Sequence, residues 1–272
     1  MDTDLDVIEK LEKLQNVIRT FNKVAVAFSG GADSSFLLHE AAEILGKENV
    51  LAITVSSPAF PKAETDAAVN FCKNAEIKQI LIDADMMSVK EFRENSTDRC
   101  YHCKKALFKK VEKTAKENDV QIVCDGSNSD DDGDYRPGLK AIAELGVRSP
   151  LKEAGLSKPE IRMLSKEAGL ISWDKPSLAC LASRIPYGEE INVKKLSMVE
   201  EAEKILHDTG LRQVRVRIHG DMARIETETD EIKKITEDKI RQNIVSGLKK
   251  LGFKYISLDL EGYRSGSMNE VL

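Results

Sequence analysis

The sequence predicts an α/β protein, with a parallel sheet covered by helices and then a smaller α/β domain. Short apolar runs alternate with amphipathic stretches in the first half of the chain, and a glycine-rich turn joins the first such pair. This alternation is typical of parallel sheets with helices on both faces. An irregular stretch over 172–188, with Trp, Pro, Cys and Gly, then interrupts the pattern. We therefore expect two domains, residues 1–188 and 189–272.

The elements follow from hydrophobic periodicity and from turn residues. In the first domain we expect helices over 5–18, from the glycine turn to Leu45, over 62–74 and over 104–118. We expect its strands over 24–28, 50–55, 78–82 and 120–125. In the second we expect helices over 193–207 and 230–251, and strands over 213–219, 222–227 and 255–260.

Composition narrows the class of protein. The chain has 272 residues and a net charge of -5, and it holds no apolar run near the roughly 20 residues of a membrane span. The acidic start lacks the order of a secretory signal, so we expect a reducing, cytoplasmic location in which five cysteines rarely form disulfides. We expect a small-molecule enzyme without a nucleic-acid or membrane partner.

The first strand leads into a loop suited to phosphate. Gly30 and Gly31 allow a close backbone approach, and the hydroxyls of Ser29 and Ser34 stand beside a helix N-terminus. The loop lacks the Lys-Ser/Thr ending of a Walker loop and the spacing of a dinucleotide fingerprint. The competing interpretation is a plain glycine turn in which Asp33 starts the helix.

The five cysteines fall into two groups. Cys72 and Cys124 lie in apolar stretches and are expected to be small buried side chains. Cys100 and Cys103 form a C-x-x-C in a polar loop that leads into a helix, and Cys180 lies in the irregular stretch. Basic neighbours and a helix start favour thiolates there, which leaves a redox pair, a zinc site or an iron-sulfur site open.

Two arginines share one face of an expected strand. Period-two alternation puts Arg215 and Arg217 on one side and valines on the other. Such a pair can bind phosphate or carboxylate, or it can be a solvated face of an edge strand.

The run Ser-Gly-Gly-x-Asp-Ser over 29–34 resembles the pyrophosphate loop (PP-loop) of the N-type ATP pyrophosphatases, and residues 125–131 resemble that family's later nucleotide motif. The resemblance implies that ATP and Mg²⁺ bind here, with Asp33 near the ion. The nucleotide-binding residues that it implies are Ser29, Gly30, Gly31, Asp33, Ser34, Val55, Ser56, Gly126, Ser127 and Asn128.

Further motifs resemble the LarE family over nearly the whole chain. They are Arg99-Cys100-Tyr101-His102-Cys103-Lys104-Lys105, Asp134-Tyr135-Arg136-Pro137-Gly138, the run 180–188, the run 214–217 and the ending 259–266. That family adenylates pyridinium-3,5-biscarboxylate mononucleotide and converts its carboxylates to thiocarboxylates for the nickel-pincer cofactor. One branch sacrifices the cysteine that matches Cys180, whereas the other holds a 4Fe-4S cluster with three cysteines. With Cys100, Cys103 and Cys180 all present, the chain resembles the cluster branch.

The same resemblance implies the roles of further side chains. Asp33, Lys104, Cys180 and Arg184 are the expected catalytic residues, and Ser183, Arg184, Glu203, Arg215 and Arg217 the expected substrate contacts. A homo-oligomer and a sulfide or other sulfur donor are expected as partners. The rival hypotheses are an iron-sulfur tRNA thiolase, against which the acidic net charge counts, and a nonenzymatic metal or cluster carrier, for which an ATP loop would be superfluous.

Overall fold

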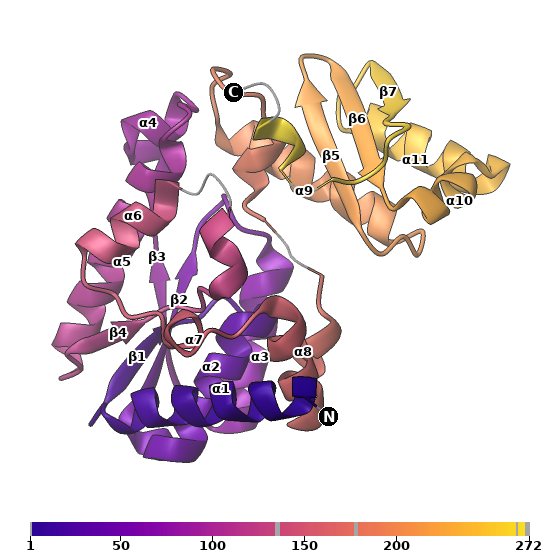
Figure 1. Cartoon of the computed structure of the whole chain (residues 1–272). Coiled ribbons are helices and arrows are strands. Elements are labelled where there is room, and N and C mark those ends of the chain that lie inside the picture. The colour runs from indigo at the N-terminus through magenta and orange to yellow at the C-terminus, as the bar shows by residue number, and fades with distance from the viewer. Residues whose placement is uncertain (1, 134–136, 177–178, 265, 270–272) are drawn as a thin grey trace. The chain divides into compact units, whose positions relative to one another are not determined.

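The computed structural model describes residues 2–133, 137–176, 179–264 and 266–269 (Figure 1). Internal contacts group the chain into two compact units. Unit 1 comprises Met1–Ser57, Lys62–Asp85 and Cys100–Ser177, and unit 2 comprises Pro58–Pro61, Met86–Arg99 and Leu178–Leu272. Unit 2 is therefore discontinuous in sequence. A division of function at residue 188 stays a prediction.

Unit 1 contains a four-stranded parallel sheet, as the sequence predicts. The strands are β1 (Val24–Ala27), β2 (Val50–Ser56), β3 (Lys78–Asp83) and β4 (Ile122–Cys124), in the order β3-β2-β1-β4. Val24 of β1 pairs with Val50 on one side and with Ile122 on the other. The chain thus moves outward through β2 and β3 and then returns to the far side of β1. This change of direction puts a switch point at the carboxyl ends of β1 and β4, where open α/β sheets bind ligands.

Helices cover both faces of this sheet because the strands are apolar on both sides. They are α1 (Asp2–Arg19), α2 (Ala32–Leu45), α3 (Lys62–Ala75), α5 (Arg99–Glu117), α6 (Pro137–Glu144), α7 (Pro150–Ala154) and α8 (Lys158–Glu167). Val24 and Val26 face a core shared with α1, α2, α3, α7 and α8. Ala25 faces a second core formed with α5 and α6.

Unit 2 is the smaller α/β body. It contains α4 (Lys90–Arg93), α9 (Val193–His207), β5 (Val214–His219), β6 (Met222–Thr227), α10 (Ile232–Thr236), α11 (Asp238–Lys250) and β7 (Tyr255–Leu258). β5 and β6 are antiparallel, β6 and β7 are parallel, and β5 is an edge strand. Leu196 and Val199 of α9 are fully buried, and the helix contacts β5.

Three local expectations need correction. The C-x-x-C lies in the first turn of α5, which begins at Arg99, and not in a loop before the helix. The helix expected over 230–251 is two helices, because Glu237 has an extended backbone with ψ of 134°. No glycine or proline marks that break. Helices α6, α7 and α8 were not expected, although Ser157 and Glu160 form a capping box at the start of α8.

Some sequence motifs fall partly outside the described residues. These positions are 134–136 of the motif that ends at Gly138, residues 177–178 of the irregular stretch, and residue 265 of the C-terminal motif. Among the helices of the described residues, each is too short or too polar to cross a lipid bilayer.

Candidate functional site

The loop between β1 and α2 lies at the switch point of the sheet. Gly30 has a positive φ of 75°, and a Cβ built there would lie 3.1 Å from the Cβ of Ala68, so the loop packs closely on α3. The hydroxyls of Ser29 and Ser34 lie 3.1 Å apart. Gly31 is the N-cap of α2 and supplies no side-chain cap, which leaves the first amides of the helix to a ligand.

The second nucleotide motif packs directly against this loop. A Cβ on Gly126 would lie 3.0 Å from the backbone nitrogen of Ser34, so a glycine permits the contact between the two loops. Ser127 donates to Asp125 at 2.5 Å, and the Asn128 backbone amide donates to Asp131 at 3.1 Å. Residues about a hundred positions apart in sequence thus form one site, as the PP-loop resemblance implies.

Asp33 lies in the first turn of α2 between charges of both signs. Burial raises the pKa of its carboxyl, and Asp131 raises it further, whereas Lys158, Arg162 and the Asn128 amide lower it. Asn128 is fully buried, and its Nδ2 has no partner of ordinary hydrogen-bond geometry among the described residues. Lys158 and Arg162 are not among the residues that the sequence predicts for this site, and the capping box of α8 could have indicated their helix.

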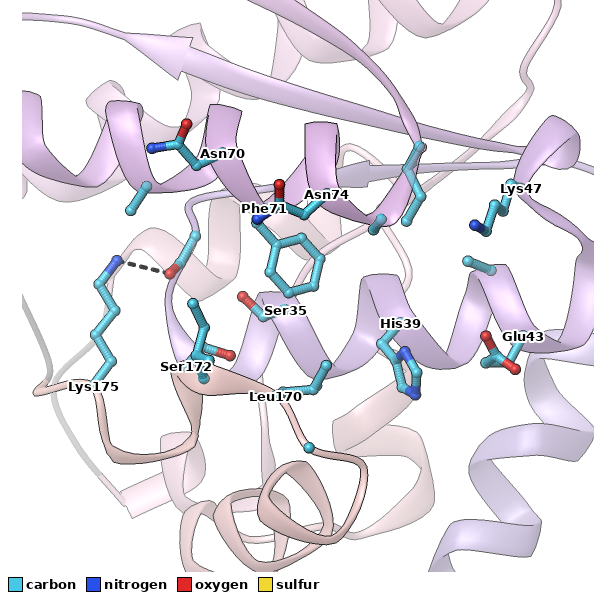
Figure 2. A pocket seen from close by; sticks show the side chains of 17 residues that line it. Ser35, His39, Glu43, Lys47, Asn70, Phe71, Asn74, Leu170, Ser172 and Lys175 are labelled. Carbon is cyan, nitrogen blue, oxygen red and sulfur yellow. Dashed lines mark hydrogen bonds between the residues drawn. The ribbon is translucent and has the colours of Figure 1, made fainter.

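A third segment, also missed from sequence, reaches the phosphate loop. Figure 2 shows Lys175, which donates from Nζ to the carbonyl oxygen of Gly30 at 2.8 Å. The two residues line one end of a cavity of about 600 Å³, whose walls come from α2, α3 and residues 169–172. Val55 and Ser56 lie at the carboxyl end of β2, as the sequence predicts, and they pair with Ile82 and Asp83 of β3.

The five cysteines differ in burial. The sequence predicts that Cys72 and Cys124 are buried, and the structure confirms it. Cys72 and Cys124 are each 1% exposed, and burial raises the pKa of the Cys72 thiol to about 12 and also raises that of Cys124. In unit 1, Cys100 is exposed and Cys103 is buried, one turn apart on α5. In unit 2, Cys180 is half-buried and precedes the short turn Leu181–Arg184.

This difference should appear in alkylation. In iron-free folded protein at about pH 8, we expect iodoacetamide to modify Cys100 and to spare Cys72, because only an exposed thiolate reacts readily. Cys72 should react once the protein is unfolded in urea. Mass spectrometry of the peptides measures both rates, and equal rates for the two cysteines in the folded state would contradict the burial of Cys72.

Lys104 lies on α5 one residue after Cys103, and the methylene groups of its side chain pack against Gly138 of α6. A Cβ on Gly138 would lie 2.7 Å from Cδ of Lys104, so this glycine leaves room for the lysine. Among the described residues, no three or more His, Cys, Asp or Glu side chains gather as ligands of a metal ion.

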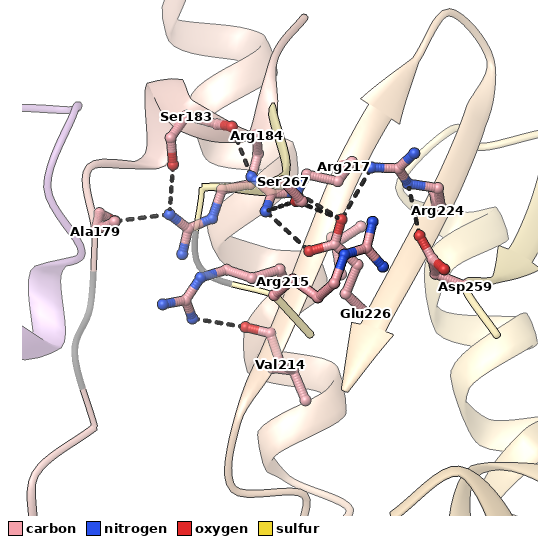
Figure 3. A network of polar contacts seen from close by, with 12 residues as sticks. Ala179, Ser183, Arg184, Val214, Arg215, Arg217, Arg224, Glu226, Asp259 and Ser267 are labelled. Carbon is pink, nitrogen blue, oxygen red and sulfur yellow. Dashed lines mark hydrogen bonds and ion pairs between the residues drawn. The ribbon is translucent and has the colours of Figure 1, made fainter. Parts of the chain in front are cut away.

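Unit 2 contains the remaining expected site residues, and Figure 3 shows four of them, Ser183, Arg184, Arg215 and Arg217. Arg184 is fully buried and binds both carboxylate oxygens of Glu203, at 2.8 and 3.0 Å. The same guanidinium donates to the carbonyl of Cys180 at 3.1 Å, and Ser183 Oγ donates to that carbonyl at 2.8 Å. The backbone turn that carries Cys180 is therefore fixed by buried polar contacts.

The two arginines of β5 are not equivalent. Both are buried, at 2% and 4% exposure, which rules out a solvated arginine face. Arg217 binds both oxygens of Glu226, at 3.0 and 2.8 Å, and donates to the Ser183 carbonyl at 2.7 Å. Arg215 donates to the Val214 carbonyl at 2.8 Å and lies over the ring of Tyr263 at 5.1 Å. Burial lowers the pKa of Arg215, and the charge of Arg184 lowers it further.

The fold and the loop at its switch point define a PP-loop nucleotide-binding protein. The sequence model of the NAD synthase family matches residues 7–122, which include the phosphate loop. An uncharacterized protein of Synechocystis is 40% identical, over 97% of this chain and 98% of its own. The pyridinium-3,5-bisthiocarboxylic acid mononucleotide synthase of Lactiplantibacillus plantarum is 37% identical, over 97% and 95%. A protein of Methanocaldococcus jannaschii is 33% identical, over 95% and 98%. The chain belongs to the LarE family of ATP-using sulfurtransferases.

Proposed function

We propose that this protein adenylates pyridinium-3,5-biscarboxylate mononucleotide and exchanges carboxylate oxygen for sulfur to give the thiocarboxylates. The observation that carries the proposal is 37% identity, over 97% of the chain, with a relative named as the synthase of the bisthiocarboxylic product. The phosphate loop and the adjoining second nucleotide motif support ATP as the co-substrate. A cytoplasmic location and a homo-oligomer belong to the same proposal.

The chemistry requires activation because a carboxylate oxygen is a poor leaving group. Attack of the carboxylate on the α-phosphate of ATP gives an acyl-adenylate and releases pyrophosphate, and sulfide then displaces AMP. The free amides at the start of α2 and the hydroxyls of Ser29 and Ser34 bind the negative charge of the departing pyrophosphate. Val55 and Ser56 line the adenosine, and Gly126, Ser127 and Asn128 complete the nucleotide site.

Two inorganic groups fit the residues present. Magnesium in nucleotide sites takes a few carboxylates plus phosphate oxygens, which fits Asp33 with Asp131 nearby. Cys100 and Cys103, one turn apart and free of disulfides, fit thiolate ligation. We assign Cys100, Cys103 and Cys180 to a 4Fe-4S cluster, which supplies the transferable sulfide when it is bound.

The remaining side chains act on the mononucleotide. We assign Arg215 and Arg217, with Ser183 and Arg184, to its phosphate or carboxylates, because buried guanidiniums held by the fold can bind an anion. Glu203 orients Arg184, and Lys104 supplies a second cation near the cysteines of α5. Exclusion of water by the stretch 172–188 would protect the adenylate from hydrolysis.

The direct test is the reaction itself. Anaerobically purified protein is incubated with MgATP, sulfide and the biscarboxylate mononucleotide, and the products are followed by chromatography and mass spectrometry. We expect AMP, pyrophosphate and a mononucleotide that has exchanged oxygen for sulfur. Sulfur that appears in tRNA and not in the mononucleotide would favour the thiolase hypothesis, and an absence of AMP would favour a carrier.

The source of the sulfur gives a separate prediction. If the three cysteines hold a cluster, the protein should contain about four irons per chain and lose them when any of Cys100, Cys103 or Cys180 becomes serine. Cys72→Ser is the matched control and should keep the iron. The sacrificial-cysteine alternative predicts the opposite, with iron-free active protein that loses about 34 mass units as Cys180 becomes dehydroalanine.

The arginines of β5 give a further prediction. Arg215→Ala and Arg217→Ala should both weaken mononucleotide binding, measured by calorimetry, more than they weaken ATP binding. Arg217→Ala should also lower the melting temperature clearly, because it removes the bidentate partner of the buried Glu226 and leaves Arg224 as the remaining arginine bound to that carboxylate. If Arg215→Ala lost as much affinity for ATP as for the mononucleotide, the assignment of Arg215 to the mononucleotide would be contradicted.

A further inference from the structure

A short segment after α8, residues 173–175, is held to that helix by its backbone. Arg162 donates from Nη1 to the Trp173 carbonyl at 3.0 Å and from Nη2 to the Lys175 carbonyl at 2.6 Å. Lys166, one turn further along the helix, lies over the Trp173 ring at 4.7 Å. The side chain of Lys175 therefore leaves a backbone whose position is fixed by α8.

From that fixed point Lys175 reaches a residue 145 positions earlier in the chain. Its Nζ donates to the carbonyl oxygen of Gly30 at 2.8 Å, in the middle of the phosphate loop (Figure 2). Burial lowers the pKa of Lys175, against the opposing charge of Glu64. Placing an amine in a half-buried position costs free energy, so the contact is not an incidental surface pair.

The geometry of a peptide bond transmits this contact into the loop. In a planar trans peptide the carbonyl and the following N–H point in opposite directions. The N–H that follows the Gly30 carbonyl is that of Gly31, which donates to Ser29 Oγ of the same loop at 3.4 Å. Ala68 of α3 packs against Gly30, since a Cβ built on Gly30 would lie 3.1 Å from the Cβ of Ala68. A donor on the carbonyl side therefore fixes the direction of the amide on the loop side.

We propose that Lys175 is a positioning residue of the phosphate loop, which holds the Gly30 carbonyl so that the Gly31 amide faces the pyrophosphate part of ATP. Arg162 acts through Lys175 by fixing the backbone from which the lysine extends. The proposal rests on the proposed function only in taking ATP as the ligand. It gives the segment 173–175 a role in nucleotide binding that the sequence motifs do not assign.

Calorimetric titration with MgATP, with pyrophosphate and with AMP tests the proposal on the full-length protein. Lys175→Met should raise the Kd for ATP and for pyrophosphate about tenfold, the usual effect of losing a hydrogen bond that involves a charged group. AMP, which lacks the pyrophosphate, should bind as before. Lys175→Arg keeps a donor and should restore most of the affinity, which a merely structural role in folding would not predict.

Lys47→Met is the matched control. Lys47 lines the same cavity, but its ammonium pairs with the exposed Glu76 at 3.1 Å and not with the phosphate loop. The Lys47→Met variant should bind ATP as tightly as the wild-type protein does. Arg162→Gln should also weaken the binding of ATP and of pyrophosphate, because it removes both contacts that hold the backbone of residues 173–175.

The possible outcomes separate this inference from the function on which it rests. Wild-type protein that fails to bind MgATP would overturn the proposed function. Wild-type binding with an unchanged Lys175→Met would overturn only the role of Lys175. An equal loss of affinity for ATP and for AMP in Lys175→Met would likewise overturn it, since control of a single amide beside the pyrophosphate would not weaken AMP binding.

Discussion

Asp33→Ala is expected to abolish ATP cleavage while leaving the protein folded. The carboxylate lies in the first turn of α2, between the two nucleotide loops, and removing it takes away the proposed contact to magnesium. AMP and pyrophosphate release should fall at least about a hundredfold, as is typical when a group that stabilises the reacting phosphates is lost. Iron content should not change, because the cysteines are separate from this carboxylate in sequence and role.

Stability provides the internal check on Asp33. Burial raises the folded-state pKa of this carboxyl, so its ionised form is less favourable in the folded chain than in the unfolded chain. The resulting loss of stability is absent at pH values below the unfolded-state pKa and is complete at pH values above the folded-state pKa. At neutral pH, Asp33→Asn should therefore have a melting temperature no lower than that of the wild type. Asp66→Ala, at an exposed position on α3, is the control and should keep full activity. Normal AMP production by Asp33→Ala would refute the assignment.

Glu203→Ala should lower the free energy of unfolding by about 3–5 kcal/mol, because it leaves the buried guanidinium of Arg184 without its carboxylate. This is the largest loss of stability that we expect among the variants proposed. Arg184 is 0% exposed and Glu203 5% exposed, and Glu203 also accepts the Val216 amide at 3.1 Å. Urea unfolding followed by circular dichroism measures the change. Asp221→Ala removes the exposed ion pair with Lys254 in the same unit and should cost at most about 1 kcal/mol.

Glu203→Ala should also affect sulfur transfer. Arg184 links Glu203 to the Cys180 carbonyl, so release of Arg184 should loosen the turn that follows the cysteine. Replacing both residues together, as Arg184→Met/Glu203→Leu, should recover stability relative to Glu203→Ala, because an apolar pair leaves no unpaired charge. A double variant less stable than Glu203→Ala would show that the arginine contacts to backbone carbonyls matter more than the ion pair.

The sequence predicts those parts of the molecule whose signals are local. Strands β1 and β2 are continuous apolar runs, and Gly30 with Gly31 marks the phosphate loop, so period and turn chemistry suffice to find them. The PP-loop resemblance adds the second nucleotide motif. The contact of Gly126 with the start of α2 then follows from the parallel order of β1 and β4.

Other features depend on partners that are distant in sequence. Arg215 and Arg217 have the same spacing pattern, yet it is Arg217 that makes a bidentate ion pair with Glu226 of β6, whereas Arg215 lies over the ring of Tyr263. Lys175 sits in an irregular stretch without periodicity, and only its contact with Gly30 distinguishes it from other lysines. Burial likewise separates the exposed Cys100 from the buried Cys103, which the C-x-x-C spacing does not.

The discontinuity of unit 2 bears on how the chain acquires its structure during synthesis. Its segment 86–99 is tied to a much later part of the chain through Asn95. This residue is fully buried with a positive φ of 56°, and its side chain donates to the carbonyls of Ile185 and Pro186 at 3.1 and 2.6 Å. An asparagine tolerates this left-handed backbone better than most residues do, so the tight turn and the distant contacts are compatible.

Two backbone hydrogen bonds join the same two parts of the chain. The Ile191 amide donates to the Arg93 carbonyl at 2.8 Å, and the Gly188 amide donates to the Asn95 carbonyl at 3.0 Å. On the ribosome, residues 86–99 emerge long before these partners exist, and contacts between such distant segments form late in folding. Unit 2 can therefore be completed only after the chain has grown past Ile191, so its early segments are the part most exposed to chaperones and proteases in the nascent protein.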